Sequence, residues 1–282
     1  MSKVALVTDS TAYIPPDLVE KYGITVAPQV LIFGEESFKD GVDISPTEFY
    51  TRLASSAIMP TTSQVAVPTF KEIFEKLHAE GKEILAVLVS DGLSKTVNSA
   101  DLASQMVPDA KVEIVNSTSV AMALGFHVLA AARAAEGGAS LEECKAVAEA
   151  ARDKTGVLFV VDTLEFLHRG GRIGGASRLL GTALQLKPLL EVRDGRVESI
   201  EKIRTKKKAY KRLVEMILER VNALDGDVRL ATLHANCFED AEVLLDELNG
   251  KLNLVESVYS EVSPVVGTHC GPGTVGIAYM VG

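Results

Sequence analysis

The stretch Ile84-Leu-Ala-Val-Leu-Val89 decides the fold class, and the polar run Ser90-Asp-Gly-Leu-Ser-Lys-Thr96 follows it directly. Six consecutive apolar residues bounded by polar ones predict a strand that is buried on both faces. Such strands belong to parallel sheets with helices on both sides. The pattern recurs near the N-terminus, where Lys3–Thr8 (KVALVT) is followed by Asp9-Ser-Thr11.

Helices are predicted between these strands. Prolines at or near first helical positions mark starts at Pro16, Pro46 and Pro68, and Ser140-Leu-Glu-Glu143 has the pattern of a capping box. Alternating strands and helices predict a parallel sheet covered on both faces. We therefore expect residues 1–152 to form an α/β/α domain. Within it, Ile24 to Phe33 reads as an extended segment interrupted by Pro28, and Thr61 to Gln64 as a polar connection between two helices.

The second half has a different pattern. Asp194-Gly195 lies between two apolar runs, Leu189–Val192 and Val197–Ile203, and predicts a β-hairpin. Further strands are predicted at Val157–Val161, Leu230–His234, Leu254–Tyr259 and Val275–Met280, with helices at about Lys206–Val221 and Phe238–Leu248. A hairpin among crossover connections predicts a mixed sheet. Residues 153–282 are therefore expected to form an α+β domain.

Composition narrows the class of protein. The chain has 282 residues, a formal charge of −9 and three cysteines without a CxxC pair. This cysteine usage fits a reducing cytoplasm and disfavours a disulfide framework or a structural zinc site. The longest mostly apolar stretch, Val120–Ala135, is too short and too polar to span a bilayer. We expect a cytoplasmic protein without membrane insertion.

Negative charge also disfavours nucleic acid as a partner, because phosphates are repelled. The negative net charge has one local exception, the basic cluster Arg204-Thr-Lys-Lys-Lys-Ala-Tyr-Lys-Arg212. A solvated helix start or a docking face for an acidic partner is the favoured interpretation. Walker A, GxSxG and HExxH motifs are absent from the sequence, so three common enzyme chemistries lack support. No metal or cofactor is expected.

Polar segments at strand ends are candidate ligand sites. Asp9–Thr11, Thr61–Gln64 and Ser90–Thr96 offer hydroxyls and helix-start amides, which bind carboxylate or phosphate. N-caps and turns are the alternative. Gly267-Thr-His-Cys-Gly-Pro-Gly273 is expected as a glycine-rich loop around His269, either an anion contact or a tight turn. Gly170-Gly-Arg-Ile-Gly-Gly175 presents an arginine suited to an anion, or ends a helix.

Taken together, these segments resemble the DegV family across essentially the whole chain. The matching motifs are Thr8-Asp-Ser-Thr11, Pro60-Thr-Thr-Ser-Gln64, Gly92-Leu-Ser94 with Thr96 and Ser99-Ala100, Leu164-Glu-Phe-Leu167 leading into Gly170-Gly-Arg-Ile173, Lys187-Pro188, and Gly267-Thr-His269 with Gly271-Pro-Gly273. The resemblance implies two α/β domains that enclose one long-chain fatty acid. It also implies a lipid-binding subunit that is not itself an enzyme and that presents the acid to a separate ATP-dependent kinase, which forms an acyl phosphate for phospholipid synthesis.

The resemblance also assigns residues. Thr62 and Ser94 are expected to hydrogen-bond the carboxylate, with His269 approaching from the other side. Arg172 is expected to support phosphoryl transfer more than lipid binding. The neighbouring candidates for ligand contact are Thr61, Ser63, Lys95, Thr96 and Thr268.

Three positions depart from the family pattern. Lys95 replaces a glycine, Asp91 replaces a serine and Asn116 replaces a frequent aspartate. Two alternatives therefore stay open: an independent hydrolase or transferase with Ser94 as nucleophile and His269 as base, or a binder of another small anionic metabolite.

Overall fold

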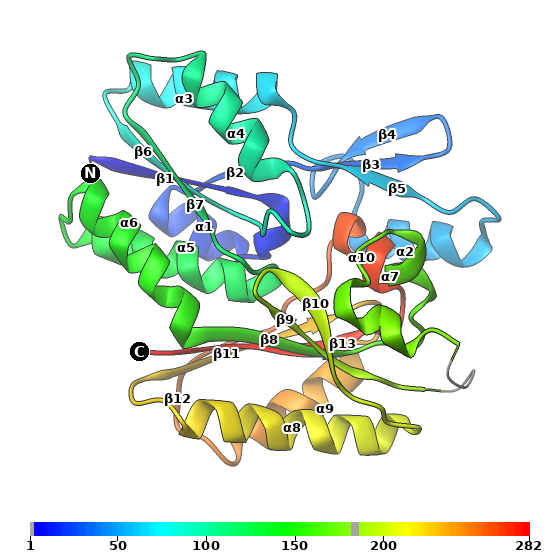
Figure 1. Cartoon of the computed structure of the whole chain (residues 1–282). Coiled ribbons are helices and arrows are strands. Elements are labelled where there is room, and N and C mark those ends of the chain that lie inside the picture. The colour runs from blue at the N-terminus through cyan, green and yellow to red at the C-terminus, as the bar shows by residue number, and fades with distance from the viewer. Residues whose placement is uncertain (1–2, 182–185) are drawn as a thin grey trace.

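The computed structural model describes residues 3–181 and 186–282 of the chain. A four-stranded parallel sheet in the order β2-β1-β6-β7 forms the centre of the N-terminal half (Figure 1). Its strands are β1 (Val4–Asp9), β2 (Thr25–Ala27), β6 (Glu83–Leu88) and β7 (Val112–Asn116). The parallel sheet predicted from the apolar runs is therefore confirmed.

A second, antiparallel sheet lies beside the first and has the strand order β4-β3-β5. Its strands are β3 (Val30–Phe33), β4 (Glu36–Lys39) and β5 (Thr61–Ser63). The extended segment predicted at 24–33, with its interruption at Pro28, is confirmed, because the chain leaves the parallel sheet after Ala27 and enters this sheet at Val30. The predicted connection at 61–64 contains strand β5, whose Thr62 is paired with Leu31.

The C-terminal half contains a six-stranded mixed sheet in the order β10-β9-β8-β13-β11-β12. The strands are β8 (Thr155–Val160), β9 (Leu189–Arg193), β10 (Arg196–Glu201), β11 (Val228–His234), β12 (Leu254–Val258) and β13 (Val275–Val281). The β9–β10 pair is the predicted hairpin, and both turn residues, Asp194 and Gly195, have positive φ as this turn requires. The mixed sheet is confirmed; the domain boundary at residue 152 stays a prediction.

Helices separate the sheets into layers (Figure 1). The helices are α1 (Pro16–Tyr22), α2 (Pro46–Ser55), α3 (Val67–Ala79), α4 (Thr96–Gln105), α5 (Ala121–Glu136), α6 (Leu141–Ala150), α7 (Glu165–Arg169), α8 (Lys206–Asn222), α9 (Phe238–Asn249) and α10 (Pro264–Cys270), with short 3-10 helices at Ser10–Ala12, Ala151–Lys154 and Gly174–Leu179. Helices α3 and α4 cover one face of the parallel sheet, and α8 and α9 cover the outer face of the mixed sheet. Helix α5 lies between the two sheets and is buried over most of its length.

Successive side chains of a strand point to opposite faces of the sheet, so each strand contributes residues to two apolar layers. In β8, Leu158 and Val160 face α8 and α9, whereas Val157 and Phe159 face the interior shared with α5. One apolar cluster therefore runs from β1 through α5 to the mixed sheet. Burial on this scale is the main stabilising contribution to folding. The consequence for function is that any cavity in this layer has apolar walls from both halves of the chain.

Local signals fix the helix starts as predicted. Ser45 and Glu48 form a reciprocal capping box at α2, and Ser140 and Glu143 do the same at α6. Prolines occupy early positions of α1, α2 and α3. None of the helices within 3–181 and 186–282 combines the length and apolar character needed to cross a membrane.

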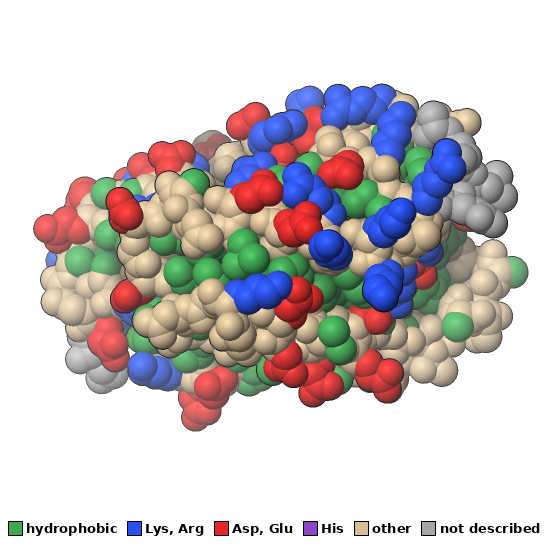
Figure 2. Space-filling model, turned by 90° about the horizontal axis from the view of Figure 1, so that it is seen from below, with side chains coloured by type: hydrophobic (Ala, Val, Ile, Leu, Met, Phe, Trp, Pro, Cys, Tyr) green, Lys and Arg blue, Asp and Glu red, His purple; other side chains and the backbone are tan. Residues whose placement is uncertain are grey.

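Basic side chains gather on the face that carries α8 (Figure 2). Several are neutralised locally: Lys206 pairs with Asp240, and Arg212 pairs with Glu201 and Glu219. The basic cluster predicted from the sequence is therefore a solvated helix start with mixed charge.

Candidate functional site

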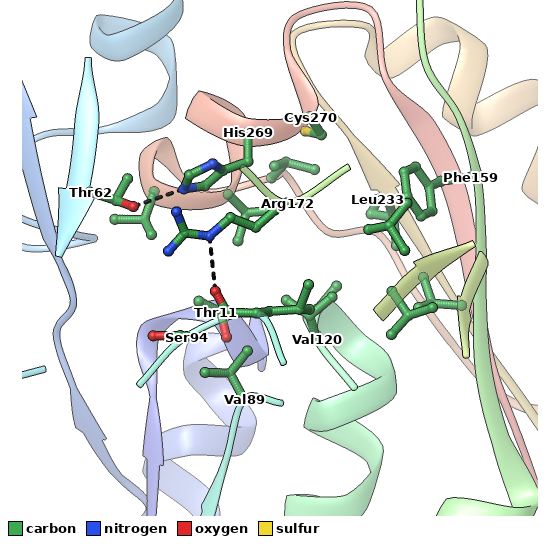
Figure 3. Close-up of a pocket in the computed structure, with 18 of the residues that line it drawn as sticks. Thr11, Thr62, Val89, Ser94, Val120, Phe159, Arg172, Leu233, His269 and Cys270 are labelled. Carbon is green, nitrogen blue, oxygen red and sulfur yellow. Dashed lines mark hydrogen bonds between the residues drawn. The ribbon is translucent and has the colours of Figure 1, made fainter. Parts of the chain in front are cut away.

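A cavity opens inside the apolar layer between the two halves of the chain. It encloses about 830 Å³ of space between atoms, and this volume includes open solvent at its mouth. Apolar side chains form most of its wall, among them Val120, Phe159 and Leu233. Phe159 and Leu233 lie together on the side away from Thr62 and His269 (Figure 3). The polar residues in the lining are Thr11, Tyr13, Gln29, Thr62, Gln64, Ser94, Arg172, His269 and Thr274. The cavity is therefore amphipathic.

His269 and Thr62 meet at the polar end. The Nε2 of His269 lies 2.8 Å from the Oγ1 of Thr62, although the two residues are 207 positions apart in the sequence (Figure 3). Gly170 makes this position possible, because a Cβ there would lie 2.1 Å from the Nδ1 of His269. That Nδ1 is buried and has no hydrogen-bond partner among the residues that the structure describes. The signal for Gly170 was present in the sequence as a glycine-rich segment, but its contact with His269 was not.

The segment that carries His269 is helical, so the predicted loop at Gly267–Gly273 is wrong over its first half. Helix α10 starts with Pro264 at its first position and ends at Cys270, before Gly271 with φ +79. Gly267 lies inside this helix. A Cβ at this position would lie 2.4 Å from the Oη of Tyr50, so a larger residue would not fit. Glycine at this position therefore serves close packing and not a turn.

Buried Asp40 anchors the start of α10. Its Oδ1 accepts a hydrogen bond of 3.2 Å from the backbone N–H of Val265, in the first turn of the helix. A carboxylate at a helix N-terminus is stabilised by the free amides and the helix dipole. Burial raises the pKa of Asp40 to about 6. A residue of the N-terminal half thus holds the helix that presents His269.

Arg172 lies across the mouth of the cavity. Its Nε donates to the carbonyl of Leu93 at 3.0 Å, and its Nη1 donates to the carbonyl of Gly170 at 2.7 Å. The Nη2 has no hydrogen-bond partner within the described part of the chain and is available to a ligand. Partial burial lowers the pKa of Arg172, but the guanidinium stays charged at neutral pH. The glycine-rich segment 170–175 therefore holds a half-buried cation at the polar end.

Ser94 lines the cavity but does not contact His269. Its Oγ lies 2.9 Å from the Oγ1 of Thr96, and its backbone N–H donates to the carbonyl of Ser90. The hydrolase alternative needs Ser94 hydrogen-bonded to His269 and a third group that orients the imidazole. The structure shows neither contact, since His269 bonds Thr62 and its Nδ1 is unpartnered. The structure therefore lacks the Ser94–His269 contact that the hydrolase alternative requires.

The other candidate residues lie outside the cavity lining. Thr96 is buried behind Ser94, and the hydroxyl of Thr268 donates to the carbonyl of Pro264 within α10. Thr61 lines a second opening beside Thr62 and His269. Lys95 lines a polar cleft that adjoins the cavity. Ser63 lines none of these three spaces.

A network centred on Asp9 shapes the polar end, and its role was missed from the sequence. The Oδ1 of buried Asp9 accepts hydrogen bonds from both the N–H and the hydroxyl of Thr11 and from the Nε2 of Gln29. Its Oδ2 accepts from the N–H of Val89. Thr11, Gln29 and Val89 all line the cavity. The motif Asp9–Thr11 showed that polar residues end the strand, but only the fold brings Gln29 to them.

Burial controls the protonation of the site. It lowers the pKa of His269 to about 4, and the nearby Arg172 cation adds to this effect. The imidazole is therefore neutral at pH 7. Burial raises the pKa of the Cys270 thiol to about 12, so this neighbour is a neutral, unreactive lining residue.

The depressed pKa of His269 predicts a pH-dependent stability. Between 6.5 and about 4 the unfolded chain binds a proton that the folded site refuses, so stability falls as the pH falls through this window. We expect His269→Gln to remove up to about 3 kcal/mol of this loss. Urea unfolding at pH 7, 6, 5 and 4.5 measures it. His127, with a pKa of about 4, and Asp40 also titrate in this range. They do so in both the wild type and His269→Gln, so their contributions cancel when the two free energies of unfolding are subtracted. Parallel curves would contradict the prediction.

Fold and cavity together define a class: an α/β protein with an amphipathic internal cavity between a parallel and a mixed sheet. The DegV family model, described as an uncharacterised protein family, matches residues 3–281. The chain belongs to the DegV family.

Relatives and solved structures agree with this assignment. A DegV domain-containing protein of Clostridium acetobutylicum is 39% identical over 280 residues, which cover 98% of this chain and 97% of that protein. A DegV family protein from Thermus thermophilus, described by its fatty-acid binding, has a TM-score of 0.94 at 35% identity, with both chains fully covered. DegV from Bacillus subtilis, described as a fatty acid binding protein, has a TM-score of 0.92 at 33% identity, also with full coverage of both chains.

Proposed function

We propose that this protein binds a long-chain fatty acid, with the acyl tail in the apolar part of the cavity and the carboxylate at Thr62, Ser94 and His269. One observation carries the proposal: a cavity whose wall is mostly apolar ends at a compact group of hydroxyls, an imidazole and a guanidinium. The description of the Thermus and Bacillus relatives as fatty-acid binding supports the same ligand class.

The tail supplies most of the affinity in this proposal. Each methylene transferred from water contributes about 0.8 kcal/mol, so fourteen contribute about 11 kcal/mol before entropic costs. The side chains of Val120, Phe159 and Leu233 have no hydrogen-bonding groups, and neither does an acyl tail, so the two surfaces are suited to each other (Figure 3). A short polar metabolite would leave this surface uncovered, so a small anionic metabolite without a tail is disfavoured.

The head group needs donors that are not already engaged. Neutral His269 can donate its Nε2–H to Thr62, which frees the Thr62 hydroxyl to donate to a carboxylate oxygen. Ser94 can turn its hydroxyl from Thr96 to the same ligand. The unpaired Nη2 of Arg172 offers a charge-assisted bond. These groups balance a carboxylate whose burial would otherwise be costly.

We further propose that the bound acid is presented to a separate ATP-dependent kinase, in the cytoplasm, for acyl-phosphate formation in lipid metabolism. The sequence contains no Walker A motif, so the nucleotide is assigned to a partner. Arg172 lines the cavity and two adjoining openings, and this position supports a role for it beside an incoming phosphoryl donor. In this proposal the protein is a non-catalytic binding subunit.

The lipid ligand is tested by identifying what co-purifies. We expect protein expressed in a bacterial host to release about one long-chain fatty acid per chain on denaturation, measured by mass spectrometry of the organic extract. A delipidated sample should take up added palmitate and reject a short acid such as butyrate, which lacks the tail energy. Protein that is empty and also refuses palmitate would sink the proposal.

A further inference from the structure

A second polar cleft lies between the two halves of the chain, away from the head-group site. Its walls come from the loop 117–119 that follows β7, and from β8, β9, α8 and β13. It contains about 1080 Å³ of space between atoms, open solvent included. Val157 and Val192 also line the amphipathic cavity, but neither Arg172 nor His269 lines this cleft. We call it the β7 cleft, because it lies at the carboxyl end of that strand, where α/β sheets commonly bind ligands.

Three arginines line the β7 cleft, and each is anchored by the protein itself. The Nε and Nη2 of Arg152 donate to the carbonyl of Asn116 at 3.1 and 2.7 Å. The Nη2 of Arg220 donates to the Oε2 of Glu191 at 3.0 Å, and the Nη1 of Arg193 lies 3.2 Å from the Oε1 of the same carboxylate. Glu191 is only 5% exposed, so a nearly buried carboxylate holds two guanidinium groups. Anchoring occupies some of the N–H groups and leaves the others as positioned donors for a ligand.

The charges of this anchored group do not cancel. Three guanidinium groups are arranged around one buried carboxylate, which leaves two positive charges in excess in a chain of net charge −9. A phosphate monoester carries a charge of about −1.5 to −2 at pH 7 and three strong acceptor oxygens. Guanidinium groups bind such oxygens through charge-assisted hydrogen bonds. The anchored arginines are therefore suited to the phosphate of a small ester.

Asp153 and Asp194 give the same cleft a second chemical character. Both are exposed, line the cleft and form no ion pair within the described part of the chain. Their carboxylates repel a bare phosphate but accept hydrogen bonds from the hydroxyl groups of a ligand. Tyr279 adds a hydroxyl of its own, and Gly156 leaves room for it, because a Cβ there would lie 2.6 Å from the Oη of Tyr279. The cleft is therefore suited to an anion that also carries hydroxyl groups.

We propose that the β7 cleft is a second ligand site, which binds a small polyol phosphate, that is, a phosphate monoester with free alcohol groups. Arg152, Arg193 and Arg220 bind the phosphate. Asp153 and Asp194 accept hydrogen bonds from the alcohol groups. The site is separate from the head-group site at Thr62 and His269, so it goes beyond the proposed function and does not depend on it.

Calorimetric titration of the full-length, delipidated protein tests the site with three probes: glycerol 3-phosphate, methyl phosphate and inorganic phosphate. We expect glycerol 3-phosphate to bind about tenfold more tightly than the other two, which lack alcohol groups. Arg193→Met should weaken its binding about tenfold, and Arg152→Met with Arg193→Met about a hundredfold or more. Asp153→Asn with Asp194→Asn should act in two directions. Inorganic phosphate should bind more tightly because repulsion is removed, and the preference for glycerol 3-phosphate should shrink.

A matched control variant separates the local from the general effect. Arg178→Met with Lys202→Met removes the same charge from exposed positions outside the cleft and should change none of these affinities. Palmitate binding should stay within about twofold of wild type in every variant, so the fatty-acid function is measured independently. Thermal unfolding of each variant confirms that it is folded.

Two results would overturn the site: wild-type protein that binds none of the three probes, or binding that ignores the loss of Arg152 and Arg193. Equal affinity for the three probes would overturn the recognition of alcohol groups and identify a site for free phosphate. Loss of palmitate binding by wild-type protein would instead overturn the proposed function and leave the β7 cleft to be judged by the phosphate probes alone.

Discussion

Val120→Phe should abolish high-affinity fatty-acid binding while leaving the protein folded. Val120 precedes α5 and projects into the middle of the cavity, between the polar end and the pair Phe159 and Leu233 (Figure 3). A phenyl ring there takes the space of several methylenes. If about six methylenes are displaced, about 5 kcal/mol is lost, and the dissociation constant rises by at least about a hundredfold. Titration of delipidated protein with palmitate measures the change.

Stability distinguishes blocking from damage in this variant. The ring fills existing space, so the melting temperature of the lipid-free protein should stay within a few degrees of wild type or rise. Val255→Phe, at an exposed position of β12, is the matched control and should bind normally. A Val120→Phe protein that is stable and still binds palmitate with wild-type affinity would show that the tail lies elsewhere.

Thr62→Ala with Ser94→Ala is the second large effect. Hydrogen bonds to a charged group contribute about 1.5–3 kcal/mol each, so the double variant should bind palmitate about a hundredfold or more weakly. Thr61→Ala with Ser63→Ala removes two hydroxyls from the same strand, neither of which lines the cavity, and is the matched control. Unchanged lipid retention in Thr62→Ala/Ser94→Ala would count against this head-group site. An equal loss in the control would point to a general effect on β5.

Arg172→Ala separates binding from transfer in the same series. The guanidinium is held by the carbonyls of Leu93 and Gly170 at the edge of the cavity, so the tail and the two hydroxyls remain when it is removed. We expect lipid retention within about tenfold of wild type and a far larger loss of acyl-phosphate formation when a fatty-acid kinase and ATP are supplied. A loss confined to lipid binding would assign Arg172 to the head group alone.

Periodicity and local capping predicted the architecture because they depend on neighbouring residues. The apolar run at Ile84–Val89 predicted a doubly covered strand, and Asp194-Gly195 predicted a tight turn between two strands. The small antiparallel sheet was not foreseen. Its strand β5 is the polar tripeptide Thr61–Ser63, which has no apolar alternation and is a strand because β3 offers it hydrogen bonds.

Helix α10, which carries His269, also could not be predicted from its local sequence. Three glycines and a proline around His269 predicted a loop, yet Pro264 starts a helix there and Asp40 caps it from the other half of the chain. Gly267 is tolerated because the helix must pass close to Tyr50, a constraint invisible in the local sequence.

The sequence by itself determined the layered α/β class and the residue types of the polar end, because turns, caps and apolar periodicity are local properties. Only the tertiary structure decided which of those residues meet. It joined Thr62 to His269, left Ser94 with Thr96, and placed Lys95 in the adjoining cleft and not in the cavity. The physical reason is that a contact across 207 residues depends on how sheets and helices pack, and this packing is set by the whole apolar core.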